Sequence, residues 1–532
     1  MGTPGRLDPA QLCKRCDPDQ FSFETTAELE DLAEVIGQAR ATDAIEFGVG
    51  IRRDGYNIYA LGEPGTGRRS VLQRFLEARA ATEPAPSDWC YVNNFEQPHK
   101  PRVLCLPAGT GVRLSRDMEQ LLEDLKSAIT AAFESDEYRA RRQELEEELK
   151  EHHEQAFETL RKEAEGHGIT LIRTPAGMAF APVKNGDVMS AEELQKLPAA
   201  EQQRIEAVVA TLHEQLERLV HQVPQWRREG QRRIRALDRE VTMLAVEHLI
   251  DELKKRYSEL PSVLGHLDAV QQAVVENADD FRRQEETPEI SFLGMTVSRG
   301  AGAAAAVRRF QVNVLIDRSS ARGAPVVYED NPSYHNLIGR VEHLSQMGAL
   351  LTDFTLIKPG TLHQANGGYL ILDARKVLVQ PYAWEGLKRA LSAREMRIES
   401  LGQMLGLVST VSLEPEPIPL DLKVVLLGER LLYYLLYHYD PEFGELFKVA
   451  ADFEEHMSRS PDGDRLYARL IATLARREQL LALDRGACAR VIEHGARLAE
   501  DTGKLSIRAR DITDLLREAD YWAHEAGREI VD

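Results

Sequence analysis

The sequence predicts an α/β core, a parallel sheet with flanking helices, which is interrupted by a long helical insertion and followed by an all-helical lid. Three observations support this prediction. A strand runs into a glycine-rich loop at residues 55–70, continuous apolar strands recur at 367–373 and 423–428, and the stretch between them carries heptad-like apolar spacing. Uniformly apolar strands are typical of parallel sheets covered by helices on both faces. The length of 532 residues allows roughly three or four domains.

The glycine-rich loop is the first candidate functional site. The stretch GYNIYALGEPGTGRRS at 55–70 begins with alternating apolar residues, and apolar positions 71, 72, 75 and 76 follow it with helical spacing. A strand, a glycine loop and a helix in this order form the context of a phosphate-binding loop, because backbone N–H groups and the helix N-terminus attract anions. We therefore predict contacts with ATP or ADP from Gly62, Pro64, Gly65, Thr66, Gly67, Arg68, Arg69 and Ser70.

The loop departs from the usual G-x-x-x-x-G-K-[ST] motif at two positions. Arg68 replaces the lysine and Arg69 replaces the serine or threonine. Arg68 can still meet phosphate oxygens, but Arg69 cannot ligate Mg²⁺, which requires oxygen donors. Ser70 supplies a hydroxyl one residue late. The alternative interpretation is a glycine-rich turn without a ligand.

The strand at 367–373 supplies the second half of the predicted site. It ends in Asp373, at the strand end where α/β folds place their ligands, so Asp373 is the candidate Mg²⁺ ligand. ATPases of this type usually carry a glutamate next as general base, but here Ala374 follows. At the end of the strand at 423–428, Glu429 stands where a polar sensor residue is expected. Hydrolysis of ATP should therefore be weak or absent.

Arg508 is the candidate for a γ-phosphate contact from the C-terminal helical region. It follows a short apolar stretch near the start of a helix, and Arg510 is the second choice. The alternative for each arginine is a solvated helix face.

The insertion is predicted to be an antiparallel helical hairpin with a small β tip. Its return arm has apolar residues at steps of three and four, which is a heptad pattern typical of a coiled coil. These residues are Ile205, Val209, Leu212, Leu216, Leu219 and Val223. The alternative is a compact helical bundle.

Composition excludes several classes of protein. The net charge of −20 argues against non-specific DNA binding, which requires basic surfaces. The apolar runs are too short to span a bilayer, and the N-terminus shows no apolar signal region, so we expect a cytoplasmic protein. Five cysteines suit a reducing compartment, and Cys13 and Cys16 are expected to be free thiols because no further zinc ligands follow them.

Several long stretches resemble the ATPase part of Lon-related proteases of the AAA+ class, in the LonB/LonC-like branch. They are GQAR at 37–40, GYNIYALGEPGTGRRS at 55–70, DWCYVNNF at 88–95, NPSYHNLIGRVEH at 331–343, IKPGTLHQANGGYLILDAR at 357–375, IESLGQMLGLVSTVSLEPEPIPLDLKVVLLG at 398–428 and DPEFGELFKVAADF at 440–453. The expected domains are an N-terminal segment with the first part of the AAA+ core (1–114), the helical insertion (115–287, with the β tip near 168–187), the second part of the core (288–458) and the helical lid (459–532).

The resemblance implies a module that captures and gates polypeptide substrates for a Lon-like ATP-dependent serine protease and that assembles as a homo-oligomer, a hexameric ring. It implies ATP or ADP with Mg²⁺ as ligands, although the substitutions at the loop make the nucleotide site degenerate. Family members normally continue into a peptidase domain with a Ser–Lys dyad. No such segment is found before Asp532, so no catalytic residue is assigned.

Two alternatives remain from the sequence. LonC-like relatives include proteins that look nucleotide-independent, so the chain is alternatively a ring scaffold that does not use nucleotide. A chromosome-associated ATPase also splits its phosphate loop from its strand-end acid by a coiled coil. The acidic charge and the short arms disfavour this class.

Overall fold

The computed structural model describes residues 13–32, 36–174, 177–184, 187–189, 198–282, 290–292, 295–297, 307–346, 349–399 and 413–532. The chain divides into two compact units, of which the first joins Met1–Ser115 to Val312–Asp532 and the second is Arg116–Gln311. The second unit is thus an insertion in the sequence of the first. The expected domain boundary at 287 and 288 lies outside the described residues.

A five-stranded parallel sheet forms the centre of the first unit. Its strands lie in the order β10 (Val326–Glu329), β15 (Tyr369–Asp373), β18 (Lys423–Gly428), β1 (Ile58–Leu61) and β19 (Val449–Asp452). The strands β15, β18 and β1 are buried along almost their whole length. The parallel, doubly covered sheet that the continuous apolar strands predicted is therefore confirmed.

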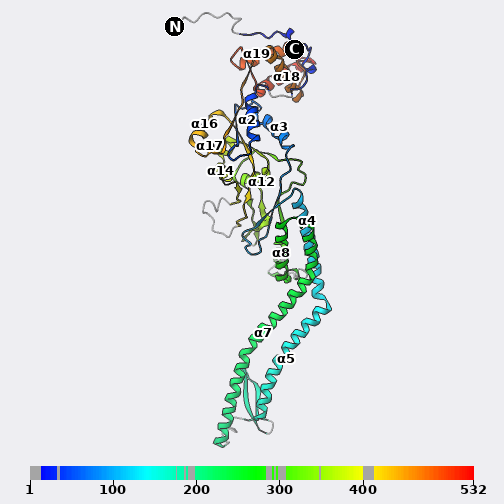
Figure 1. The fold of residues 1–532 in the computed structure, drawn as a ribbon, viewed down its shortest axis with the longest axis vertical. Coiled ribbons are helices and arrows are strands. Elements are labelled where there is room, and N and C mark those ends of the chain that lie inside the picture. The colour runs from blue at the N-terminus through cyan, green and yellow to red at the C-terminus, as the bar shows by residue number, and fades with distance from the viewer. Residues whose placement is uncertain are drawn as a thin grey trace. The chain divides into compact units, whose positions relative to one another are not determined.

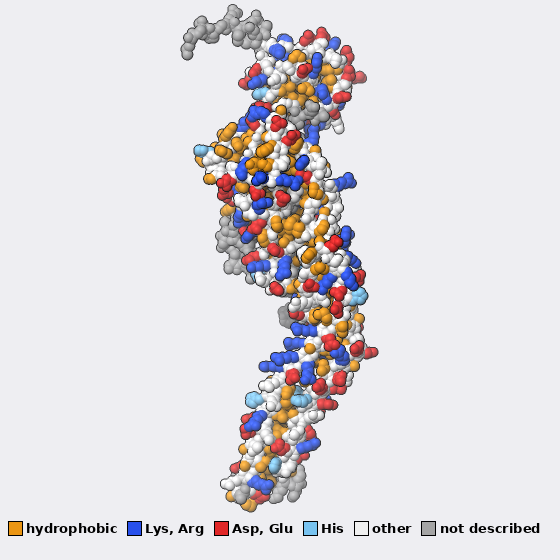
Figure 2. All heavy atoms as spheres, in the orientation of Figure 1, with side chains coloured by type: hydrophobic (Ala, Val, Ile, Leu, Met, Phe, Trp, Pro, Cys, Tyr) orange, Lys and Arg blue, Asp and Glu red, His pale blue; other side chains and the backbone are white. Residues whose placement is uncertain are grey.

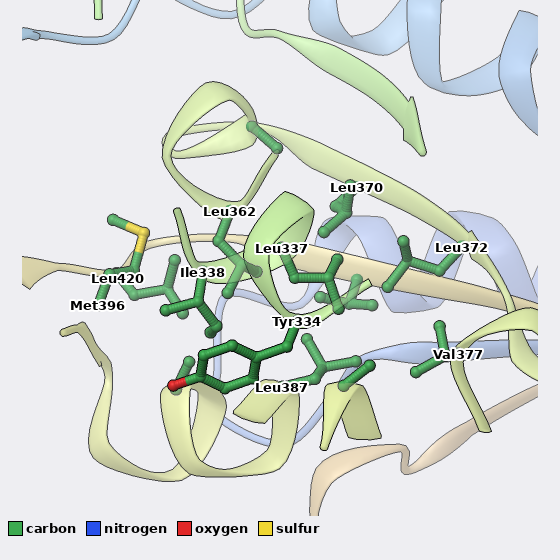
Figure 3. Close-up of a cluster of buried hydrophobic side chains, with 14 of the residues drawn as sticks. Tyr334, Leu337, Ile338, Leu362, Leu370, Leu372, Val377, Leu387, Met396 and Leu420 are labelled. Atoms are coloured by element: carbon green, nitrogen blue, oxygen red, sulfur yellow. The ribbon is translucent and has the colours of Figure 1, made fainter. Parts of the chain in front are cut away.

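Helices cover both faces of this sheet, because successive side chains of a strand point to opposite faces. One face packs Leu370, Leu372, Val424 and Leu426 against α11 (Tyr334–Ile338), α12 (Thr361–Ala365) and α14 (Ala383–Ala393), as Figure 3 shows. The other face packs Ile371, Val425 and Leu427 against α2 (Ala39–Gly50) and α3 (Arg68–Ala80). The sheet thus holds the end of β1, where the glycine loop begins, on a rigid base.

A second sheet is antiparallel and has the order β3 (Arg102–Leu106), β2 (Asp88–Val92) and β9 (Val312–Ile316). Further described elements of the chain are α13 (Ala374–Val379), α16 (Arg430–Tyr439), α17 (Phe443–Leu446), η3 (Phe354–Leu356), β7 (Ile290–Phe292), β8 (Met295–Val297), β11 (Arg340–Val341), β12 (Leu344–Gln346), β13 (Ala349–Leu351), β14 (Ile357–Lys358), β16 (Glu395–Met396) and β17 (Ile418–Pro419).

The C-terminal lid consists of α18 (Pro461–Arg477), α19 (Arg485–Leu498), α20 (Ala509–Glu525) and a hairpin of β20 (His456–Ser458) and β21 (Lys504–Ser506). Residues 13–32, which contain η1 (Pro18–Gln20) and η2 (Thr26–Glu28), pack onto this lid. Phe21 and Phe23 lie in the hydrophobic core of the lid, and the backbone N–H of Thr26 donates to the carbonyl of Leu483 at 2.8 Å.

The second unit is built on two long antiparallel helices, α5 (Asp136–Gly166) and α7 (Ala199–Arg256), which run side by side in Figure 1. We call this pair, with the strands at its end, the arm. Near one end of the pair, Tyr138 donates a hydrogen bond from its hydroxyl to Asp238 at 2.8 Å. Near the other end, Leu160 packs with Leu212 and Leu216. This antiparallel arrangement confirms the long helical insertion.

A small β-sheet closes the arm, with β4 (Ile169–Thr174), β5 (Gly177–Lys184) and β6 (Asp187–Val188) in antiparallel order. Two other helices of the second unit are α8 (Pro261–Glu276) and α9 (Ala278–Arg282), while α4 (Thr110–Glu134) runs across the boundary between the units. Among the described helices, none combines the length and the apolar character that a bilayer crossing requires.

Candidate functional site

The glycine loop connects the end of β1 to the start of α3, as the sequence predicted. Gly65 has a φ of +90° and Gly67 a φ of +73°. Side chains with a Cβ avoid this left-handed region, which explains glycine at both positions. Thr66 is buried, and its hydroxyl donates to the carbonyl of Glu63 at 3.0 Å. The loop therefore has a defined conformation at the N-terminus of a 13-residue helix.

Arg68 turns its side chain toward the sheet. Its Nη1 donates to the carbonyl of Ala60 at 3.3 Å and also to the carbonyl of Gly428. Burial lowers the pKa of the Arg68 guanidinium. The guanidinium of Arg68, which replaces the lysine of the motif, thus donates hydrogen bonds to carbonyls at the ends of β1 and β18.

Arg69 lies on the surface, and its Cζ is 3.5 Å from the centroid of the Tyr328 ring in β10. This distance corresponds to a cation–π contact. Ser70 is also exposed. Position 69, where the motif has the serine or threonine whose hydroxyl binds Mg²⁺, therefore carries an arginine that contacts Tyr328 instead.

Asp373 lies at the end of β15, as expected, but its carboxylate has a structural role. It accepts a hydrogen bond from the backbone N–H of Lys376 at 2.9 Å and caps α13. Ala374, at the position of the missing base, is buried. In the part of the chain that the structure describes, no group of three or more His, Cys, Asp or Glu side chains is placed to hold a metal ion.

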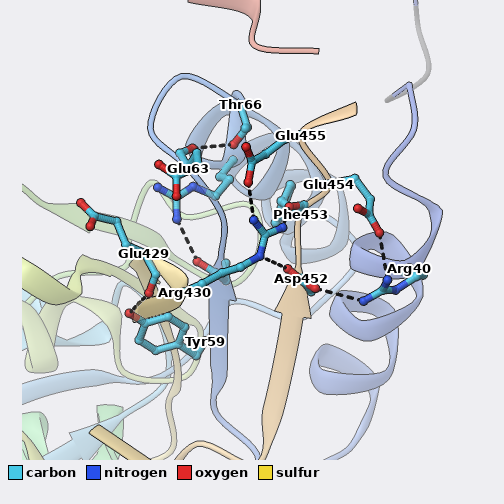
Figure 4. Close-up of polar contacts among 12 residues, drawn as sticks. Arg40, Tyr59, Glu63, Thr66, Glu429, Arg430, Asp452, Phe453, Glu454 and Glu455 are labelled. Atoms are coloured by element: carbon cyan, nitrogen blue, oxygen red, sulfur yellow. Dashed lines mark hydrogen bonds and ion pairs between the residues drawn. The ribbon is translucent and has the colours of Figure 1, made fainter. Parts of the chain in front are cut away.

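The end of β18 has space only for glycine at position 428. A Cβ at Gly428 would collide with the hydroxyl of Tyr59 and would lie 3.2 Å from the Cβ of Ala374. The Tyr59 hydroxyl itself donates to the carbonyl of Glu429 at 3.3 Å (Figure 4). The side chain of Glu429 is exposed. A buried tyrosine on β1 thus fills the space beside Gly428, and this was not apparent from the sequence.

The lid brings Arg510 close to the loop. A Cβ at Gly65 would lie 3.4 Å from the Cβ of Arg510, which is an exposed residue of α20. Arg508, at the N-cap of α20, does not point into open solvent, because its Nη2 lies 3.0 Å from Oε2 of Glu455.

Four further residues of this region were missed by sequence reasoning. Arg430 pairs with Glu455 and, through Nε at 3.0 Å, with Asp452. Arg40 of α2 pairs with the other oxygen of Asp452 at 3.0 Å (Figure 4). Arg40 and Arg430 lie far in the sequence from Asp452 and Glu455, so the fold brings these opposite charges together.

These residues do not fit a Mg²⁺–nucleotide site that hydrolyses its ligand. The loop retains backbone N–H groups at a helix N-terminus, which suit a phosphate. The hydroxyl ligand and the base are replaced by Arg69 and Ala374, and Arg68 and Arg508 already have partners within the chain. What remains is an anion-attracting loop without the groups that activate water.

Three protein-family models match this chain. Residues 322–454 match the "LonB-like, AAA domain", residues 482–532 match the "Archaeal LonB, AAA+ ATPase LID domain" and residues 88–121 match the "Lon-like LonC helical domain". AAA+ domains as a class bind nucleotides and typically oligomerise, so both properties are implied at the level of the class.

Among curated proteins, the chain is similar to the "Putative Lon protease homolog" of Escherichia coli (strain K12), with 35% identity over 103 residues. This match spans 19% of the chain and 17% of that protein.

Among solved structures, the chain is similar to NtrX from Brucella abortus, at 15% identity, a TM-score of 0.26, and coverage of 53% of this chain and 70% of that chain. A second NtrX structure, in complex with ATP, gives 13% identity, a TM-score of 0.25, and coverage of 53% of this chain and 68% of that chain. Structural likeness this low carries no argument. The chain thus carries a stretch similar to the LonB-like AAA domain, a stretch similar to the archaeal LonB lid and a stretch similar to the LonC helical domain.

Proposed function

We propose that this chain is the substrate-handling module of a Lon-like protease, which captures and gates polypeptides without hydrolysing ATP. The observation that carries this proposal is the internal use of Arg68, whose guanidinium donates to the carbonyls of Ala60 and Gly428. Phosphoryl transfer relies on positioning and charge stabilisation by such groups, and on a base that orients water. Ala374 supplies no base.

The arm supports the capture of polypeptides. A groove of about 880 Å³ is lined by α5 and by residues of β4 and β5, among them Phe157, Leu171 and Met178. The Met178 side chain is 46% exposed at this groove. Figure 2 shows acidic and basic side chains interspersed with apolar ones along the arm. A partly apolar groove with a mixed-charge rim suits unfolded polypeptide, which offers both kinds of group.

Assembly into a homo-oligomeric ring is part of this proposal. The helix α16 exposes a face of large apolar and aromatic side chains, seen as an orange patch near that helix in Figure 2. Its exposed members are Leu431, Tyr434, Leu435, Tyr437 and Tyr439. Exposed apolar patches rich in tyrosine are typical of protein interfaces. We infer that a second copy of this chain covers the patch, and that a Lon-type peptidase domain is the proteolytic partner.

Polypeptide binding tests the proposal directly. We expect fluorescently labelled, reduced and carboxymethylated α-lactalbumin, which is permanently unfolded, to bind the chain, while native calcium-loaded α-lactalbumin does not. Fluorescence anisotropy measures both. Because a charge in the groove is unfavourable for apolar contacts, Met178→Glu should weaken binding about fivefold or more.

Val220→Glu is the matched control, because Val220 is 50% exposed on α7 and does not line the groove. Equal binding of native and unfolded α-lactalbumin, or an equal effect of both variants, would contradict capture by the groove.

The second candidate function is a nucleotide-independent ring scaffold. It is favoured by the ion pairs that join the lid to the core through Glu455, since they require no ligand. In this case the chain would hold a peptidase ring in register without binding substrate itself, and the same anisotropy experiment would show no binding of unfolded α-lactalbumin.

A further inference from the structure

The short segment that follows β19 faces arginines from three different elements. Arg40 comes from α2, Arg430 is the first residue of α16 and Arg508 is the N-cap of α20. The acids that meet them are Asp452, the last residue of β19, and Glu454 and Glu455 just after it. Figure 4 shows the contacts of Arg40 and Arg430 with these acids. The lid and the α/β core are thus joined here through side chains of opposite charge.

Glu455 occupies the centre of this arrangement. One carboxylate oxygen binds Arg430 of the core, and the other lies 3.0 Å from Nη2 of Arg508 of the lid. Only 20% of the Glu455 side chain is exposed. Burial alone would raise the pKa of Glu455, but hydrogen bonds from Arg508 and Arg430 outweigh it, and the pKa lies below its usual value. The carboxylate is therefore charged at neutral pH and bridges two cations.

Backbone hydrogen bonds hold the segment that carries Glu455 at the start of the glycine loop. The N–H of Phe453 donates to the carbonyl of Leu61 at 2.9 Å, and a Cβ at Gly62 would lie 3.0 Å from the Cβ of Phe453. The N–H of Ile507 donates to the carbonyl of Glu455 at 2.9 Å. Glu455 is consequently held between the start of the loop and the residue that precedes Arg508.

The Glu455 carboxylate is an anion that contacts both a core arginine and a lid arginine. In a nucleotide-binding site, the terminal phosphate could make the same two contacts. We propose that the carboxylate of Glu455 is a built-in substitute for a nucleotide phosphate, which holds Arg430 and Arg508 together and excludes a free polyphosphate from them. This inference rests on the proposed function, in which the site does not turn over nucleotide, and it names the residue that controls access to the site.

The competing explanation is that Glu455 forms an ordinary structural ion pair. The two explanations predict different effects on polyphosphate binding when the charge of Glu455 is removed. If Glu455 only stabilises the fold, Glu455→Gln weakens the lid contact and leaves polyphosphate binding as it was. If Glu455 substitutes for a phosphate, the same variant frees the guanidinium of Arg508 and the Nη1 group of Arg430, while Nε of Arg430 stays paired with Asp452.

Isothermal titration calorimetry with inorganic tripolyphosphate and with ADP, in the absence of Mg²⁺, tests this proposal. We expect Glu455→Gln to bind tripolyphosphate about tenfold more tightly than the wild type, because Arg508 loses its carboxylate partner and Arg430 keeps only Asp452. Glu454→Gln is the matched control, since Glu454 pairs with Arg40 and is 40% exposed. It should leave the affinity unchanged. Adding Arg508→Gln to Glu455→Gln should remove the gain.

Folding of each variant is checked by circular dichroism and thermal unfolding. If Glu455→Gln does not fold, Glu455→Asp keeps the charge but is too short to bridge both arginines, and it should show a smaller gain in tripolyphosphate affinity. Unchanged affinity in a folded Glu455 variant, or an equal gain in Glu454→Gln, would overturn the proposal. Binding of unfolded α-lactalbumin is measured alongside, so that failure of this inference is separate from failure of the proposed function.

Discussion

At the scale of single residues, two adjacent arginines explain most of the character of the site. Arg68 faces the sheet and Arg69 stacks on Tyr328 at the surface. The same residue type thus has a buried role at one position and an exposed role at the next, because α3 turns the two side chains in different directions. Both side chains make their contacts within the chain.

The two arginines should differ in their contribution to stability. Arg68→Met leaves the carbonyls of Ala60 and Gly428 without this donor, and we expect it to lower the free energy of unfolding by about 1–3 kcal/mol. Arg69→Met removes an exposed cation–π contact and should cost less than about 1 kcal/mol. Urea unfolding followed by circular dichroism measures both. A larger loss for Arg69→Met would show that the internal role of Arg68 is misassigned.

The sequence predicted the loop residues but not their partners. Gly65, Gly67 and Asp373 follow local patterns, and each lies at the predicted turn or strand end. The Arg430–Glu455–Arg508 contact joins residues that have no local signal and are 25 and 53 positions apart in the chain. Whether a surface arginine points to solvent, to phosphate or to a carboxylate is decided by tertiary packing, which a single sequence does not reveal.

At the scale of elements, the periodicity of apolar residues correctly predicted the main strands and the long helix of the insertion. The uniformly apolar strands β15 and β18 became central parallel strands, and the heptad-like spacing of residues 205–223 became the buried side of α7. The packing of residues 13–32 on the lid was not predicted, because this segment is polar and has no regular period. Phe21 and Phe23 bind it to the lid core through side chains that are too few to form a periodic pattern.

The stability of the arm should fall when a charged residue is introduced on the buried side of α7, but not when it is introduced on the exposed side. Leu216 is 4% exposed and packs with Leu160 and Leu212, so we expect Leu216→Asp to destabilise the arm by at least about 2 kcal/mol. Hydrogen exchange measured by mass spectrometry should show faster exchange near residues 205–220, while the strand at 423–428 remains protected.

Val220→Asp, at an exposed position of the same helix, should change neither region. If Leu216→Asp also abolished the protection of residues 423–428, the arm would not be an independent unit.

At the scale of the whole molecule, a long insertion interrupts the sequence of the α/β unit, and the five strands of its parallel sheet still pair with one another. The first unit closes its parallel sheet from segments on both sides of Arg116–Gln311. The lid is joined to this sheet by carboxylate–arginine contacts that need no ligand. The lid and the sheet are therefore connected by contacts within the chain itself, and under our proposal the arm provides the surface that binds polypeptides.

Steady-state ATP turnover, measured with Mg²⁺ and with or without unfolded α-lactalbumin, tests the central claim most directly. The wild type should release phosphate at the background rate under both conditions, and Asp373→Asn should give the same rate, because our proposal assigns Asp373 the role of a helix cap. Binding of unfolded α-lactalbumin should proceed unchanged without ATP. Turnover above background that rises with polypeptide and is lost in Asp373→Asn would contradict the account and establish a working ATPase.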